Sequence, residues 1–96
     1  MSDEQVPTAE LSRLAVALDV VDARAELNHR YRRLITDSRT ALEASRIRIT
    51  QARGIAKKLM VLVKAAGPGF VDGLPEAERT AVRDGLAQAD ELIHRG

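Results

Sequence analysis

The sequence runs from Thr8 to Arg53 without a proline or a glycine. These are the residues that most often interrupt regular structure, so their absence over this distance favours long helices. Apolar residues recur at spacings of three and four, and the strand-type period of two never appears, which predicts no strands. The apolar share is 45%, mostly alanine, leucine and valine, whereas aromatic residues make up only 2%, which suits close helix packing. We therefore expect an all-α fold.

Caps and turn residues divide the chain into three helices within a single domain. Thr8 follows Pro7 and is a suitable N-cap for the first helix, and Gly67 is a natural C-cap for the second. Gly85 lies inside the third helix, where it costs about 1 kcal/mol relative to alanine unless close packing offsets that cost. The expected elements of the domain, residues 1–96, are a helix over about 8–21, a long helix over about 23–66, a turn over 67–74 and a helix over about 75–95.

The central helix would be unusually long. At ~1.5 Å per residue its length would be about 60 Å. We place a break near residues 20–24, where Asp19 and Asp22 are suitable local caps, and a single helix over 8–66 is the alternative. The two shorter helices would fold against the long one, as a hairpin or bundle of one chain or of a dimer.

Charge is strongly segregated along the chain. Residues 1–23 have a net charge of −4, residues 24–64 of +8 and residues 65–96 of −3, although the whole chain has a formal charge of only +1. A basic central segment between two acidic ones favours pairing among the chain's own helices, or with a charged partner.

A heptad pattern runs along the basic segment and predicts a coiled-coil-like seam. One side of the seam has large apolar residues, and the other has mostly small ones that let a second helix approach closely. We expect self-association or binding of a partner protein helix through this seam. Its predicted interface residues are Ile35, Ser38, Leu42, Ser45, Ile49, Ala52, Ala56 and Leu59.

Four arginines flank the seam at strict seven-residue spacing: Arg32, Arg39, Arg46 and Arg53. One interpretation is a charged edge that binds nucleic acid or another polyanion by neutralising its phosphates. The other is that these arginines pair with acids on neighbouring helices, such as Asp19, Asp22, Glu78 and Asp84. The second interpretation is favoured, because acidic segments lie on both sides of the basic one. Nucleic-acid binding is further weakened because no aromatic residues alternate with the basic ones to stack on bases and no helix-turn-helix is recognisable.

One histidine lies in a distinctive setting. Residues 26–34 read Glu-Leu-Asn-His-Arg-Tyr-Arg-Arg-Leu. This segment resembles the phosphoacceptor helix of HWE-type and related bacterial histidine kinases, whose pattern is Glu-Leu-x-His-Arg-x-Lys-Asn-x-Leu. The resemblance implies that His29 is a phosphoacceptor, although Arg32 and Arg33 replace the Lys and Asn of the pattern. No ATP-binding domain pattern follows, so it implies passive phosphotransfer in a kinase-associated helical hairpin.

Other activities find no support in the residues present. There is no cysteine, which excludes disulfides and thiolate chemistry, and no pair of histidines at metal-ligand spacing. We therefore expect no enzyme activity, no metal site and no cofactor. The start of the chain lacks a secretory pattern, and the longest apolar run, residues 59–63, is too short to span a bilayer, so we expect a cytoplasmic protein.

These features predict a non-enzymatic helical oligomerisation or protein-partner-binding module. The first alternative is a phosphotransfer or histidine-kinase-associated hairpin that uses His29. The second is a basic nucleic-acid-binding protein that uses the arginine row.

Overall fold

The computed structural model describes residues 4–95, and 72% of it is helical. The expected all-α class is confirmed in its main part by four α-helices, but the described chain also contains two short strands. In chain order the elements are β1 (Gln5–Pro7), a 3₁₀ helix η1 (Thr8–Leu11), α1 (Ser12–Arg24), α2 (His29–Ala41), β2 (Arg46–Arg48), α3 (Ile49–Ala65) and α4 (Glu76–His94).

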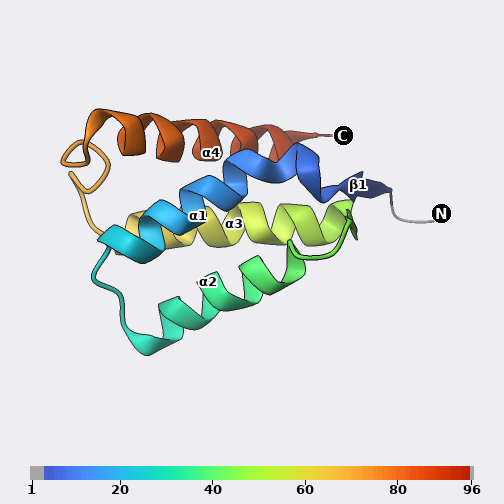
Figure 1. Ribbon diagram of the computed structural model, residues 1–96, viewed down its shortest axis with the longest axis horizontal. Coiled ribbons are helices and arrows are strands. Elements are labelled where there is room, and N and C mark those ends of the chain that lie inside the picture. The colour runs from blue at the N-terminus through green and yellow to red at the C-terminus, as the bar shows by residue number, and fades with distance from the viewer. Residues whose placement is uncertain (1–3, 96) are drawn as a thin grey trace.

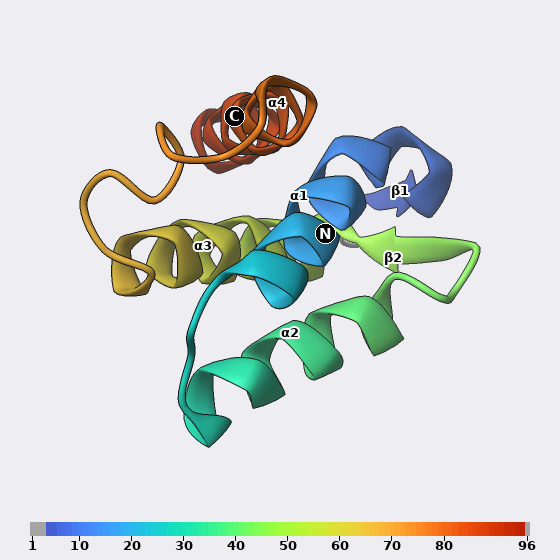
Figure 2. The same cartoon turned by 60° about the vertical axis from the view of Figure 1, so that its left-hand side comes forward.

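The helices form a small bundle with α1 and α3 at its centre. Helix α4 lies along one side of this pair and α2 along the other (Figures 1 and 2). The most extensive contact joins α1 to α4, followed by that between α3 and α4, whereas α2 touches α1 and α3 more sparsely. The longest dimension of the chain is 42 Å, and its Cα radius of gyration is 12.9 Å. A globular chain of this length is expected to have a radius of about 12.5 Å, so no helix projects far from the rest.

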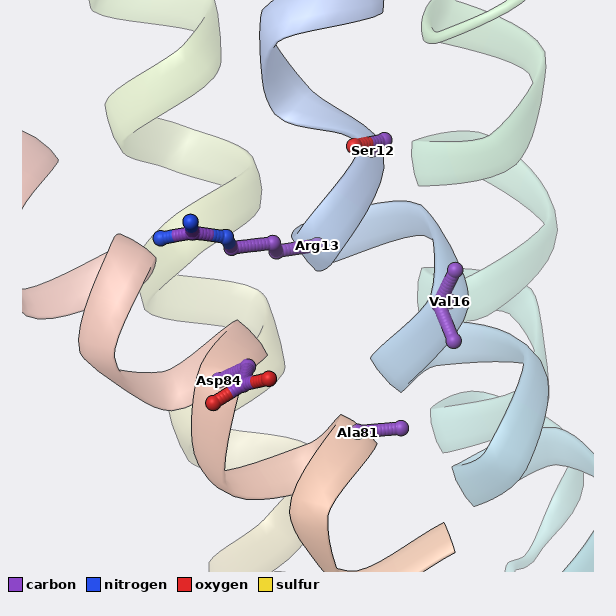
Figure 3. Close-up of a pocket in the computed structure, with 5 residues that line it drawn as sticks. All are labelled: Ser12, Arg13, Val16, Ala81 and Asp84. Atoms are coloured by element: carbon purple, nitrogen blue, oxygen red, sulfur yellow. The ribbon is translucent and has the colours of Figure 1, made fainter. Parts of the chain in front are cut away.

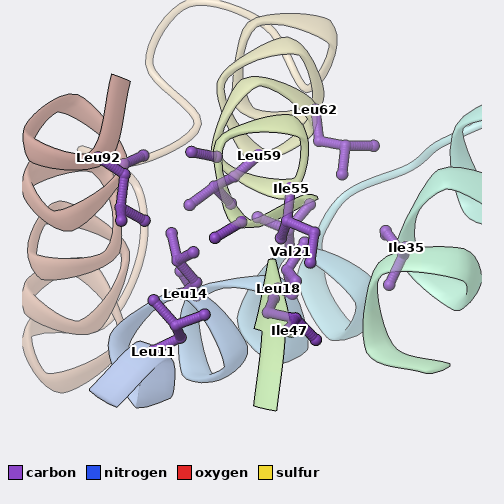
Figure 4. Close-up of a cluster of buried hydrophobic side chains, with 14 of the residues drawn as sticks. Leu11, Leu14, Leu18, Val21, Ile35, Ile47, Ile55, Leu59, Leu62 and Leu92 are labelled. Carbon is purple, nitrogen blue, oxygen red and sulfur yellow. The ribbon is translucent and has the colours of Figure 1, made fainter. Parts of the chain in front are cut away.

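Apolar side chains from all four helices meet in one core (Figure 4). In α1, Leu14, Leu18 and Val21 are fully buried, and their spacings of four and three place them on one helix face. Leu59 and Leu62 of α3 are likewise fully buried. Burying a leucine or valine side chain contributes about 1.5–3 kcal/mol, so these stripes fix how α1 and α3 pack.

The predicted long helix over 23–66 is wrong. The chain leaves the helical conformation after Ala41, passes through β2 and resumes as α3 at Ile49. Because α2 and α3 run back along each other, both bury their apolar faces against α1 in the same chain. A continuous 60 Å helix would leave much of that apolar surface in water.

The two strands close one end of the bundle. They pair antiparallel, with Val6 opposite Ile47, and both side chains are buried. On either side of Ile47, Arg46 and Arg48 are exposed. Arg46 to Ile49 therefore alternate exposed and buried, so the prediction that a period of two is absent is wrong for this short segment.

Helix ends agree only partly with expectation. The expected break after the first helix is present, although α1 ends at Arg24 and α2 begins at His29, a few residues later than predicted. The prediction that Thr8 is an N-cap is wrong, because its hydroxyl instead donates to the carbonyl oxygen of Ala44 at 2.6 Å, which joins the start of η1 to the loop before β2. Gly67 follows α3 with a φ of +103°, as expected of a glycine C-cap.

Gly85 allows α1 and α4 to pack closely. A Cβ at this position would lie 2.3 Å from the Cβ of Ala17 and 2.8 Å from the carbonyl oxygen of Arg13. The close packing that was named as the condition for a glycine inside this helix is therefore present. The same interface includes Gln88, which accepts a hydrogen bond from the Leu14 amide at 3.1 Å and donates one to the Glu10 carbonyl at 2.5 Å.

Candidate interaction surface

The predicted association seam lies largely inside the chain's own core. Six of its residues are buried, Leu42 is half-buried and Ser45 is exposed. Their packing partners belong to the same chain, so a second chain would reach them only if the fold opened. The Ser38 hydroxyl is also buried, without a hydrogen-bond partner in the described part of the chain. The six buried seam residues are Ile35, Ser38, Ile49, Ala52, Ala56 and Leu59.

The first two arginines of the predicted charged edge pair with α1. Arg32 contacts the carboxylate of Asp22 at 3.2 Å, and Arg39 contacts that of Asp19 at 3.0 Å. These ion pairs hold α2 against α1, and all four side chains are substantially exposed. Pairing with neighbouring acids is thus confirmed for this half of the row, where each exposed pair contributes at most about 1 kcal/mol.

The other two arginines lie in different settings. Arg53 reaches the C-terminal end of α4, where its Nε donates to the Leu92 carbonyl at 3.1 Å and its Nη2 donates to the Arg95 carbonyl. It thereby adds hydrogen bonds at the C-terminal end of α4, where the Leu92 carbonyl also accepts from the Arg95 amide at 3.4 Å. Arg46 is exposed on β2 and forms no ion pair with any of residues 4–95. The row is therefore not one continuous cationic edge.

The two α4 acids expected beside the row do not contact it. Glu78 binds Arg24 instead, through two hydrogen bonds of 2.8 Å to Nε and Nη2. The hydrogen bonding and charge of Glu78 raise the pKa of Arg24 above its ordinary value. Asp84 forms no ion pair within residues 4–95.

His29 is the first residue of α2. It follows Asn28, whose side chain caps the helix by accepting a hydrogen bond from the Tyr31 amide at 3.1 Å. The first three residues of the segment that resembles a phosphoacceptor helix, 26–28, are therefore outside the helix. His29 is exposed, as are Arg30 and Arg33, which form no ion pair in the described chain. What the resemblance implies for His29 stays a prediction.

A group of unpaired cations lies on β2 and α3. No carboxylate occurs between Glu43 and Asp72. This run is visible in the sequence, but the prediction of a charged edge followed the seven-residue arginine spacing instead. The cations of this run form no ion pair with described residues, and only Arg53 among them is hydrogen-bonded to another helix. We call the following residues, which lie on β2 and on the side of α3 away from the core, the α3 face: Arg46, Arg48, Gly54, Lys57, Lys58, Val61 and Lys64.

Helical spacing explains how the α3 face is assembled. Gly54, Lys57, Val61 and Lys64 follow one another at intervals of three and four, so they lie on the same side of α3, opposite Leu59 and its buried neighbours. Val61 is 48% exposed, which is high for a large apolar residue, and it lies between two lysines. On α3, this face therefore has a glycine and an exposed valine along its middle and lysines beside them.

Two hollows elsewhere have mixed charge. A shallow one of about 180 Å³ lies between α1 and α4, with Arg13 and Asp84 on its two walls and Val16 at its edge (Figure 3). A second, of about 210 Å³, contains the ion pair of Arg39 and Asp19. Neither hollow gathers side chains of one charge.

Metal sites and membrane spans were expected to be absent. Within residues 4–95, no group of His, Asp or Glu side chains is arranged to hold a metal ion. Among the same residues, no helix combines the length and hydropathy that crossing a bilayer requires. No family model, curated protein or solved structure matches this chain.

Proposed function

We propose that this chain is a non-enzymatic binding module that docks an acidic protein partner on the α3 face. The observation that carries the proposal is a run from 44 to 71 without a carboxylate, in which three unpaired lysines, Lys57, Lys58 and Lys64, lie near the exposed side chain of Val61 on α3. Two more unpaired cations, Arg46 and Arg48, lie on β2 just before the helix begins. Surfaces of ordinary soluble domains intersperse both signs of charge, whereas a single-sign surface attracts and orients a partner of opposite charge.

A protein partner fits this face better than a nucleic acid does. Phosphate groups would use the cations alone, whereas a protein would also cover the apolar surface of Val61. The two aromatic residues of the chain, Tyr31 and Phe70, are half-buried against the core and lie outside the α3 face, so they offer no stacking platform there.

A second copy of the chain fits the α3 face poorly. Two α3 faces related by a two-fold axis would bring Lys57, Lys58 and Lys64 of both copies together, and like charges repel. The predicted seam offers no alternative contact in this fold because six of its residues are buried. The structural features thus favour a different, acidic protein as the partner.

The experiment uses a defined probe, a fluorescent 21-residue helical peptide with leucines along one stripe and glutamates on both flanks. Binding is measured by fluorescence anisotropy at 0.15 M salt, beside a scrambled peptide of equal composition and a DNA duplex. We expect the striped peptide to bind most tightly. Lys57→Glu with Lys64→Glu, and separately Val61→Ser, should each weaken binding at least tenfold, because they remove charge attraction and apolar contact respectively.

The matched control is Arg30→Glu with Arg33→Glu, which makes the same double charge reversal on α2, outside the α3 face. This variant should bind the striped peptide within about twofold of the unmodified chain. Tighter binding of the duplex would identify a nucleic-acid surface instead. Equal binding of the striped and scrambled peptides, or no binding of either, would reject docking of an acidic protein on this face.

A further inference from the structure

Two glycines interrupt the interiors of helices in this chain, and the structure explains only one of them. Glycine is less favourable than alanine inside a helix, so each position calls for a reason. At Gly85 the reason is the contact of α4 with α1, because a Cβ there would overlap Ala17 and the backbone of Arg13.

Gly54 has no such reason within the described chain. A Cβ built on Gly54 meets no heavy atom within 4 Å, and its backbone φ is not positive. An alanine would therefore fit this position of α3 without a clash and would favour the helix. The free chain gains nothing that we can identify from the absence of a side chain here.

The position of Gly54 indicates which contact would benefit from the lack of a side chain. Gly54 lies on the α3 face, three residues before Lys57 and seven before Val61. A glycine on an exposed helix face lets the backbone of another element come close. Its neighbours on the α3 face are the cations and the exposed valine that the proposed function assigns to the partner.

We propose that the acidic partner docks as a helix that crosses α3 at Gly54, an inference that rests on the proposed function and specifies its binding mode. Val61 provides the apolar contact two turns further along, about 10.5 Å from Gly54 at ~1.5 Å per residue. That seven-residue interval matches the heptad spacing of a packed helix pair. Lys57, Lys58 and Lys64 then pair with carboxylates on the flanks of the partner helix.

Two glycine variants test whether the free chain requires glycine at positions 54 and 85, by thermal unfolding of the full chain. Gly54→Ala should raise the melting temperature, because the new methyl group meets open space and favours the helix. Gly85→Ala should lower it, because its methyl group has no room. A lower melting temperature for Gly54→Ala would overturn the inference, since it would show that the free chain itself needs a glycine there.

A bulky substitution tests the crossing itself, with the striped acidic peptide as the probe. Gly54→Leu should leave the fold intact, verified by circular dichroism, and weaken peptide binding at least tenfold by holding the two helices apart. The control is Ala87→Leu, which adds a leucine at an exposed position of α4 and should leave binding unchanged.

The outcomes separate this inference from the proposed function. If Gly54→Leu binds as tightly as the unmodified chain while the double lysine variant does not, the crossing at Gly54 is rejected and the acidic docking surface stands. If the unmodified chain does not bind the striped peptide, both proposals fail.

Discussion

At the scale of single residues, Gly85 controls the closest approach in the bundle. We predict that Gly85→Ala destabilises the chain by about 1–3 kcal/mol, since the added methyl group must push α4 away from Ala17 and the Arg13 backbone. Urea unfolding followed by circular dichroism measures the change in unfolding free energy. Alanine at the neighbouring exposed position of Asp84 is a suitable control, and equal stability of Gly85→Ala and the unmodified chain would contradict the packing described.

At the scale of elements, α1 depends on a side chain from α4 for its N-terminal cap. No side chain of its own caps α1, and the amide of Gln88 bridges the Leu14 N–H and the Glu10 carbonyl instead. We predict that Gln88→Met, which retains the length of the side chain but not its hydrogen bonds, costs about 1–2 kcal/mol.

Amide hydrogen exchange provides the specific readout for this cap. In Gln88→Met the Leu14 amide should exchange faster than in the unmodified chain by more than the global loss of stability requires. Gln88→Glu retains an acceptor for Leu14 but loses the donor to Glu10, so its exchange should be intermediate. If Leu14 exchanges no faster in Gln88→Met, the bridge does not cap α1.

The helices and strands also show which parts of the fold can be predicted from the sequence. The helical class, the turn after Gly67 and the last helix follow from local signals: periodicity, glycine and proline. The division of residues 23–66 into separate helices does not follow from local signals. The same heptad pattern is compatible with one continuous helix and with two helices that pack antiparallel. Tertiary pairing of Val6 with Ile47 decides between them, and the only local sign of it is the brief alternation from Arg46 to Ile49.

The candidate site was harder to predict than the fold for a related reason. Heptad positions indicate which residues share a helix face, but not whether that face meets the same chain or another one. Ile35 and Leu59 occupy seam positions and are buried internally, whereas Lys57 and Val61 lie on the opposite face and stay exposed. Likewise, the regular spacing of Arg32 and its counterparts does not reveal which arginines find carboxylates on α1.

At the scale of the whole molecule, we predict that the purified chain without a partner is a monomer. Its apolar stripes are buried internally, and the unpaired lysines of the α3 face repel those of a second copy. Light scattering coupled to size-exclusion chromatography should therefore give the chain mass of 10.5 kDa at both low and high salt. Small-angle scattering should give a radius of gyration slightly above the 12.9 Å Cα value, because side chains and hydration water add to it.

A discrete oligomer at both salts would show that an apolar surface joins copies of the chain. An oligomer only at high salt would instead point to the α3 face, where screening of the lysines removes the repulsion that keeps copies apart.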